Sequence, residues 1–203
     1  MALFFSDHKL VDFDDWFATF KNNKVRLELE EKTGVKAIRV IRFPDKPNHC
    51  MVVFEAPNRA AMSQIETDPR LQERFTDKSI FFEPPTIIGG YYVTDLEFFT
   101  PGEDSSIKPF WIKHDLVDYD KWYDHRVETE ATREAMMQEH GVRNVRLLQN
   151  IDDPNDVIGV VLAPSRDIIV ALLSEPNVQE LFANREIYKG IPVVIGPFSG
   201  IEL

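Results

Sequence analysis

The spacing of apolar residues changes period several times along the first half of the chain. Short segments in which apolar and polar residues alternate predict β-strands, and they cover residues 3–10, 36–42, 50–55 and 86–97. Longer charged segments with apolar residues at helical spacing predict two helices, over residues 12–34 and 58–75. The predicted order of elements in this half is therefore βαββαβ.

Capping and turn residues support these boundaries. Asp12 or Asp14 provides an N-cap for the first helix, and Gly34 suits the left-handed position that ends it. In the last strand, the pair Gly89-Gly90 predicts a β-bulge. The capping residues and the glycine pair thus agree with the helix and the strand that the hydrophobic pattern predicts.

A phrase that opens the first helix occurs a second time in the chain. Residues 8–17 are HKLVDFDDWF, and residues 114–123 are HDLVDYDKWY. Shorter matches continue to the end of both halves, among them Pro47-Asn48 with Pro154-Asn155. Such self-similarity predicts an internal duplication. We predict two repeats, residues 1–98 and residues 109–203, joined by a linker over residues 99–108.

A βαββαβ unit folds into a four-stranded antiparallel sheet with both helices on one face, the ferredoxin-like arrangement. The other face of such a sheet is bare and has to be buried. We therefore predict an α+β protein in which the antiparallel sheets of two fused ferredoxin-like repeats face each other as one pseudo-twofold α/β barrel. The chain would then be a monomer, a fused pseudo-dimer, although a further dimer stays open.

These motifs resemble those of the dimeric α/β-barrel superfamily, and within it the antibiotic-biosynthesis-monooxygenase-like proteins. The resemblance lies in the repeated His-x-Leu/Val-x-Asp-Phe/Tyr-x-x-Trp phrase, the later Gly-Val pair, the Asp153-Pro154-Asn155 turn and the proline before the last strand. It covers nearly the whole chain, once per half. It implies a cofactor-independent oxygenase, cyclase or isomerase, although the superfamily also includes lactone isomerases, haem-degrading enzymes and members with no known activity.

Two departures from the superfamily narrow this implication. Its haem-degrading members carry a histidine on the second helix, whereas residues 58–75 contain none, so haem degradation is not expected. A strand carboxylate that is frequent in the superfamily is present as Glu55 but is replaced by Leu162 in the second half. Only the first half could use that carboxylate.

The bulk composition excludes several classes of partner. A formal net charge of −11 gives no electrostatic attraction for nucleic acid or anionic lipid. The apolar run at the N-terminus is too short for a signal peptide or a membrane span. One cysteine, Cys50, leaves no intrachain disulfide, so a reducing cytoplasm is expected. The histidine spacings indicate no metal site, and no cofactor is expected.

The repeated phrase supplies the main candidates for chemistry. His8 and His114 lie among apolar residues of a strand, where an imidazole could act as a general acid or base. The alternative is a histidine that hydrogen-bonds neighbouring backbone. Trp16 and Trp122 could form the wall of a substrate pocket, or they could simply pack in the core.

Three arginines are further candidates for substrate binding. Arg39 and Arg146 occupy matching positions in the second strand of each repeat and could hold a carboxylate or phenolate, or form salt bridges. Arg126 replaces Phe20 on the first helix, which would give the second half a preference for anions. The alternative for Arg126 is a rotated helix that places Arg126 in water and Tyr119, Tyr123 and Val127 inward instead.

Two functional hypotheses follow. The first is a cofactor-independent enzyme that acts on a small hydrophobic aromatic or polyketide-like molecule in a pocket between sheet and helices. His8 or His114 would move a proton, and an arginine would stabilise the enolate or phenolate. The second is a non-catalytic module of the same fold that binds a small ligand or a protein. A pocket that encloses a histidine together with a convergent polar group favours the first.

Overall fold

A computed structural model describes residues 1–96 and 106–203 of the chain, and it divides them into two compact units. The first unit comprises Met1–Tyr92 together with Ser199–Leu203, and the second comprises Val93–Phe198. The predicted linker over residues 99–108 lies mostly outside the described residues. The repeat boundaries themselves stay a prediction.

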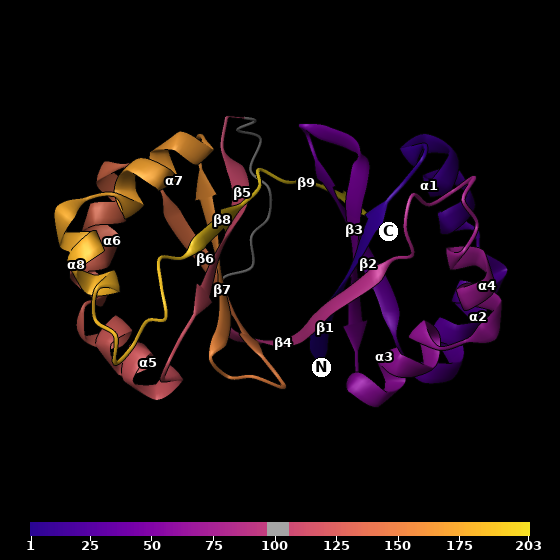
Figure 1. The fold of residues 1–203 in the computed structure, drawn as a ribbon, viewed down its shortest axis with the longest axis horizontal. Coiled ribbons are helices and arrows are strands. Elements are labelled where there is room, and N and C mark those ends of the chain that lie inside the picture. Colours follow the sequence, from indigo (N-terminus) through magenta and orange to yellow (C-terminus); the bar gives the residue numbers. More distant parts are fainter. Residues whose placement is uncertain (97–105) are drawn as a thin grey trace. The chain divides into compact units, whose positions relative to one another are not determined.

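The first unit has a five-stranded antiparallel sheet with four helices on one of its faces (Figure 1). The order of its strands is β4-β1-β3-β2-β9. The strands are β1 (Ala2–Lys9), β2 (Lys36–Phe43), β3 (Lys46–Ala56), β4 (Thr86–Leu96) and β9 (Ser199–Glu202). The helices are α1 (Phe13–Lys21), α2 (Lys24–Thr33), α3 (Arg59–Glu66) and α4 (Pro69–Phe75).

The second unit repeats this order of elements, with the strand order β8-β5-β7-β6. Its strands are β5 (Lys108–Asp115), β6 (Arg143–Asn150), β7 (Asp156–Ala163) and β8 (Val193–Ile195). Its helices are α5 (Tyr119–Glu128), α6 (Glu130–Glu139), α7 (Arg166–Leu173) and α8 (Pro176–Phe182). In each unit the fourth strand lies beside the first and the third beside the second, which confirms the α+β class and the ferredoxin-like topology.

The first predicted helix is in fact two helices, because the chain breaks at Asn22 and Asn23. The Asn23 side chain accepts hydrogen bonds from the backbone N–H groups of Val25 (3.0 Å) and Arg26 (3.2 Å), so it starts a new helix instead of continuing the old one. The predicted ends are correct: Asp12 caps α1, and Gly34 ends α2 with a φ of 73°.

The last predicted strand of the second half is also split. After β8 the chain passes through Gly196 and Pro197 and then forms β9, which pairs with β2 of the first unit in the register Val40 to Ile201. The predicted bulge in β4 is confirmed, since the pairing of β1 with β4 shifts register across Gly89-Gly90. Both irregularities occur at glycines, where backbone freedom permits them.

The repeated asparagine of the Pro-Asn turn holds the start of the first helix in each unit. The Asn48 side chain accepts from Phe13 N–H (3.1 Å) and donates to the Val11 carbonyl (2.9 Å). Asn155 likewise accepts from Tyr119 N–H (2.8 Å). The first residues of β3 and the residue before β7 thereby fix where the repeated phrase enters its helix.

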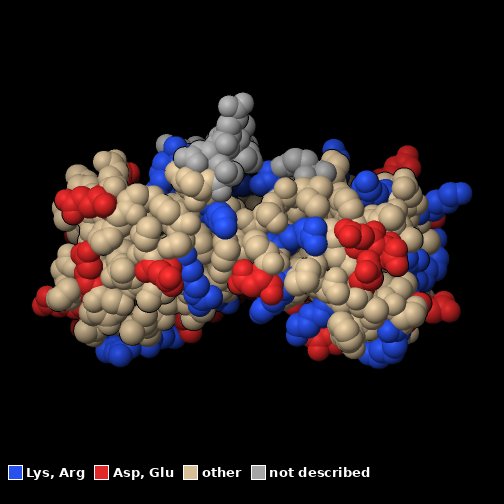
Figure 2. Space-filling view, turned by 90° about the horizontal axis from the view of Figure 1, so that it is seen from above, with Lys and Arg blue, Asp and Glu red and all other residues tan. Residues whose placement is uncertain are grey.

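Every helix within the described residues is too short or too polar to span a bilayer. On the described part of the face in Figure 2, Lys and Arg side chains lie interspersed with Asp and Glu side chains. A mixed surface of this kind offers no broad area of one sign to a polyelectrolyte. The expectation that nucleic acid is not a partner stays a prediction.

We predict that Asn48→Ala lowers the free energy of unfolding by about 1.5 kcal/mol, because both side-chain hydrogen bonds to the start of α1 are lost. Urea denaturation followed by circular dichroism measures the change. The matched control is Asn22→Ala, whose exposed side chain makes one long bond of 3.5 Å and should change stability by less than about 0.5 kcal/mol. Equal effects of the two variants would contradict this role of Asn48.

Candidate active site in the first unit

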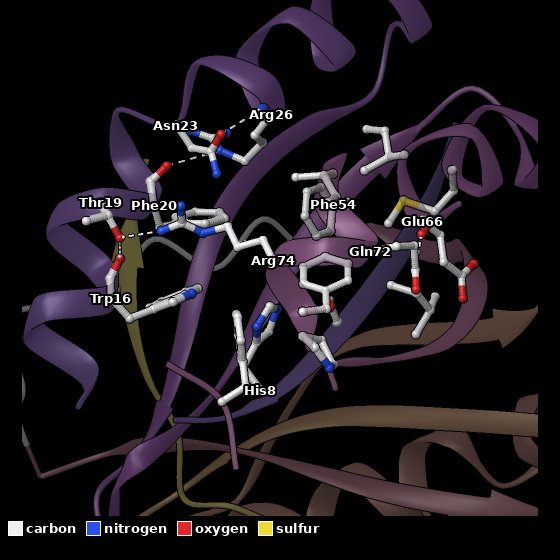
Figure 3. A pocket seen from close by; sticks show the side chains of 18 residues that line it. His8, Trp16, Thr19, Phe20, Asn23, Arg26, Phe54, Glu66, Gln72 and Arg74 are labelled. Atoms are coloured by element: carbon white, nitrogen blue, oxygen red, sulfur yellow. Dashed lines mark hydrogen bonds between the residues drawn. The ribbon is translucent and has the colours of Figure 1, made fainter. Parts of the chain in front are cut away.

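A cavity of about 80 Å³ lies between the sheet and the helices of the first unit (Figure 3). Strands β1, β3 and β4 form its floor, and helices α1 to α4 form its walls. Its lining is mostly apolar, with a small number of polar groups. The polar side chains that line it are Ser6, His8, Thr19, Asn23, Arg26, Glu66, Gln72 and Arg74.

The alternation of β1 places His8 in the floor of this cavity. His8 pairs with Cys50 and Ser6 pairs with Val52 on β3, and directly opposed residues of antiparallel strands point to the same face. Both Ser6 and His8 are buried, each with 4% of its surface exposed. Ser6 was not among the predicted site residues, although it stands two positions before the predicted histidine on the same face.

Aromatic rings surround the imidazole of His8. Its centroid lies 5.2 Å from the Trp16 ring and 5.9 Å from the Phe81 ring, both tilted. Neither ring nitrogen of His8 has a hydrogen-bond partner among the described residues. This excludes, for His8, the alternative of a histidine that hydrogen-bonds neighbouring backbone, and it leaves both nitrogens to a ligand or to water.

Burial lowers the pKa of His8 from 6.5 to about 3, and the nearby His49 ring adds to the effect. The imidazole is therefore neutral at physiological pH, so one ring nitrogen can donate a hydrogen bond and the other can accept one. His49 itself lies against Asp7, with 2.6 Å between Nε2 and Oδ1, on the other face of the sheet. A neutral base in an apolar cavity is the main electrostatic feature of the site.

The polarity of the lining increases from the floor to the mouth. Thr19 and Gln72 are exposed, while Asn23 and Arg74 are half-buried. One Nη of Arg74 donates to Thr19 Oγ1 at 3.2 Å and so connects α4 with α1 across the opening (Figure 3). A shallower surface groove of about 460 Å³ shares Asn23, Leu71 and Arg74 with the cavity and continues it outward.

The second unit keeps the histidine and the tryptophan but surrounds them with apolar residues. The His114 ring lies 5.5 Å from Trp122, and burial lowers its pKa to about 4, with the charge of Arg126 adding to the effect. At the positions of Ser6, Glu66 and Arg74 this unit has Ile112, Leu173 and Leu181. Ile112 is a core residue, and Leu173 packs against the same cluster as Trp122.

Arg126 lies with its guanidinium carbon 5.7 Å from the centroid of the Trp122 ring, and it is half-buried. The alternative of a rotated helix is wrong for Tyr123 and Val127, which are 40% and 55% exposed, whereas Tyr119 does pack against the core cluster that contains Trp122. Near Trp122, the indole donates a hydrogen bond to the Tyr188 hydroxyl. The first unit has Phe81 at the position of Tyr188 and therefore lacks this hydroxyl.

Three predicted binding residues do not reach the cavity. Arg39 pairs with Val53 in the ladder, next to Glu55, and both lie on the sheet face opposite to His8. Arg146 pairs with Val160 on the equivalent face of the second unit. A residue one position away in a strand points to the opposite face, so alternation excludes these three side chains from the helix-covered pocket.

Arg74 was not among the site residues predicted from the sequence. The difference between the two halves at its position could have indicated it. Arg74 corresponds to Leu181 in the second half, and Ser6 corresponds to Ile112, so the polar residue occurs in the first half both times.

Within the described residues, no group of three His, Cys, Asp or Glu side chains could hold a metal ion. Burial raises the pKa of Cys50 to about 12, so its thiol stays protonated.

Solved structures share this fold at low sequence identity. An anthrone oxidase-like protein is 10% identical over 99% of this chain and 93% of its own, with a TM-score of 0.51. A presumed monooxygenase of Fusobacterium nucleatum is 11% identical (100% and 96% covered, TM-score 0.49), and chlorite dismutase of Candidatus Nitrospira defluvii, solved with imidazole, is 15% identical (96% and 91%, TM-score 0.41). No protein-family model and no curated protein matches the chain.

The anthrone oxidase-like protein has a TM-score of 0.51 with this chain, so the comparison agrees with the fold that the resemblance in the sequence implies. At such identities the likeness concerns the backbone topology alone. The chemistry has to be argued from the side chains of the cavity.

We predict that His8 makes stability depend on pH below 6.5. The unfolded histidine binds a proton near pH 6.5, but the folded one does so only near pH 3, so the unfolded state binds more protons in this range. The free energy of unfolding should fall by about 1.4 kcal/mol per pH unit for this residue as the pH decreases from 6.5.

Thermal midpoints between pH 7.5 and 4.5 measure this effect. His8→Gln should flatten the profile by the contribution of one histidine, while His114 continues to contribute. The control is His125→Gln, at a half-buried residue of α5, and its pH profile should match that of the wild type. A His8→Gln profile parallel to that of the wild type would contradict the assignment.

Proposed function

We propose that the chain is a cofactor-independent enzyme that removes a proton from a small aromatic or enolisable molecule in the first-unit cavity. The observation that carries this proposal is His8, a neutral and buried imidazole whose two nitrogens have no partner in the described residues. A free base at the end of an apolar, aromatic cavity is suited to a substrate that brings its own acidic proton.

In this mechanism His8 accepts a proton from a hydroxyl group or an activated carbon of the substrate. Trp16 and Phe81 hold the ring of the substrate beside the imidazole. The low pKa disfavours an isolated imidazolium, but the substrate anion formed in the same step lies next to it and stabilises it. The electron-rich anion can then react with dioxygen, close a ring onto a carbonyl, or be reprotonated elsewhere.

The volume of the cavity limits the size of the substrate. A space of about 80 Å³ holds several water molecules, but a dry cavity that binds benzene measures ~150 Å³. Entry of a ring therefore requires side chains at the mouth, such as Gln72 and Arg74, to move outward toward the groove. A molecule of one or two rings fits this limit better than a large polycyclic one.

The second candidate function is a non-catalytic module that binds a small ligand. The same low pKa of His8 favours it, because a base whose pKa is about 3 accepts protons weakly at pH 7. In this reading the two ring nitrogens act only as a donor and an acceptor for the ligand. Turnover distinguishes the two candidates, whereas binding does not.

We also propose that the two repeats form one pseudo-twofold barrel, as the duplication predicts. On the sheet face away from the helices, the first unit presents Phe5, Met51 and Val53, and the second presents Trp111 and Val160. An apolar sheet face needs a cover, and two such faces in one chain can cover each other.

Sedimentation velocity should then give a single species with the chain mass of 23.5 kDa. An obligate dimer at micromolar concentration would contradict a self-contained barrel.

The enzymatic proposal predicts the effect of two matched substitutions. Activity is screened against quinols, anthrones, hydroxylated aromatic acids and lactones, with oxygen consumption and product formation as readouts. For any substrate turned over, His8→Gln should lower kcat by at least about 100-fold, because a general base contributes 10²–10⁴-fold. His114→Gln should change kcat less than about threefold, since its surroundings are apolar core.

The same assay can reject the proposal. Equal activity of His8→Gln and wild type would remove His8 from the chemistry. Binding of panel members without turnover of any of them would favour the non-catalytic candidate. A loss confined to His114→Gln would move the active site to the second unit.

A further inference from the structure

We propose that the first-unit cavity selects carboxylates: molecules with an apolar ring in the cavity and a carboxylate at the mouth, held by Arg74 and Asn23. This inference rests on the proposed ligand-binding role of the cavity and adds the chemical class of the ligand. It replaces the predicted roles of Arg39 and Arg146, which lie on the other face of the sheet.

Arg74 differs from the other arginines at the mouth because it forms no salt bridge within the described residues, although the carboxylate of Asp77 interacts with its charge from a longer distance. Arg70 forms ion pairs with Glu28 and Asp68. Arg26 is paired with Glu30 and donates to the carbonyls of the last turn of α1. Within the described residues, Arg74 makes one hydrogen bond, to the neutral hydroxyl of Thr19. Four of its five N–H donors are therefore left to a ligand or to solvent.

Asn23 provides a second donor at the same place. Its side-chain oxygen is held by the N–H groups of Val25 and Arg26, so its amide nitrogen has a fixed direction and no partner in the described residues. Figure 3 shows this amide on the same side of the pocket as the Arg74 guanidinium. Asn23 also caps the ten-residue helix α2, whose first turn carries no acidic residue, so the positive end of the helix dipole faces the mouth.

The acidic residues around the pocket cancel this positive charge only in part, through the electrostatic interaction of Asp77 with Arg74. Figure 3 shows Glu66 on the side of the cavity opposite to Arg74. Asp77 in the adjoining groove accepts hydrogen bonds from the backbone N–H (2.9 Å) and the hydroxyl (2.7 Å) of Ser79. Arg26 covers the carbonyls of Phe20 and Lys21, so the negative end of α1 is neutralised as well.

The geometry points to a carboxylate on an apolar body for two reasons. A planar guanidinium beside an amide donor matches the two oxygens of a carboxylate. A single cation, partly compensated by Asp77, on a chain of net charge −11 favours a monoanion over a phosphate dianion. With the carboxylate at the mouth, the other end of the ligand is directed toward His8 in the floor, which orients the molecule for proton transfer.

The test compares aromatic carboxylates with neutral isosteres. Benzoate, phenylacetate and 2-naphthoate are titrated by calorimetry against the full chain, each beside its primary amide. The wild type should bind at least one acid about tenfold more tightly than the matching amide, since a charge-assisted contact contributes about that much. Arg74→Leu, which introduces the residue found at position 181, should abolish the preference, and Arg74→Lys should restore part of it.

Controls separate this inference from the enzymatic proposal. Arg166→Leu makes the same change in net charge on the exposed face of α7 and should keep the preference for acids. His8→Gln should weaken acids and amides by the same factor and so keep their ratio, because His8 lies in the floor and the carboxylate at the mouth, and the result does not depend on turnover. Equal binding of acids and amides, or a preference that survives Arg74→Leu, would overturn the carboxylate assignment and leave the enzymatic proposal standing. Failure of every acid and amide to bind at millimolar concentration would overturn both.

Discussion

The site depends on a buried imidazole that the protein itself does not satisfy. A polar group taken out of water without a partner costs about 1–3 kcal/mol, and in His8 both ring nitrogens are in this condition. The pairing of β1 with β3 imposes it, because the face that carries His8 also carries Phe4 and the apolar residues opposite it. Such a group is disfavoured unless water or a ligand completes its hydrogen bonds, and we propose a ligand for the first unit.

The two halves share one backbone topology but differ in the side chains between their sheet and helices. Each unit places a histidine beside a tryptophan, holds its first helix through an asparagine, and ends its second helix at a left-handed glycine. Around this common frame the first unit has polar side chains that reach the cavity, and the second has Ile112, Leu173 and Leu181 at the matching positions. At these positions the second unit therefore packs apolar side chains where the first has polar groups.

The chemistry proposed for the cavity is consistent with its electrostatics. The low pKa of His8 keeps the floor neutral, whereas Arg74, which forms no salt bridge within the described residues, attracts an anion to the mouth. Bound between them, a substrate would have its fixed charge kept away from the apolar floor and its acidic proton directed toward the base. Because the carboxylate would bind at the mouth and the proton would be transferred at the floor, no permanent ion has to be desolvated in the apolar part of the cavity.

The sequence by itself determined the order of elements, the caps Asp12 and Gly34 and the bulge at Gly89-Gly90, because these depend on local patterns and short spacings. It did not determine the break at Asn23, where a side-chain cap competes with helix continuation, or the pairing of β9 with β2, which joins residues at opposite ends of the chain. It also misplaced Arg39, Glu55 and Arg146, since a one-residue difference in a strand decides the face. Only the tertiary structure brought Arg74 to Thr19 and Asn23, because such a contact between helices depends on packing and not on any pattern within one segment.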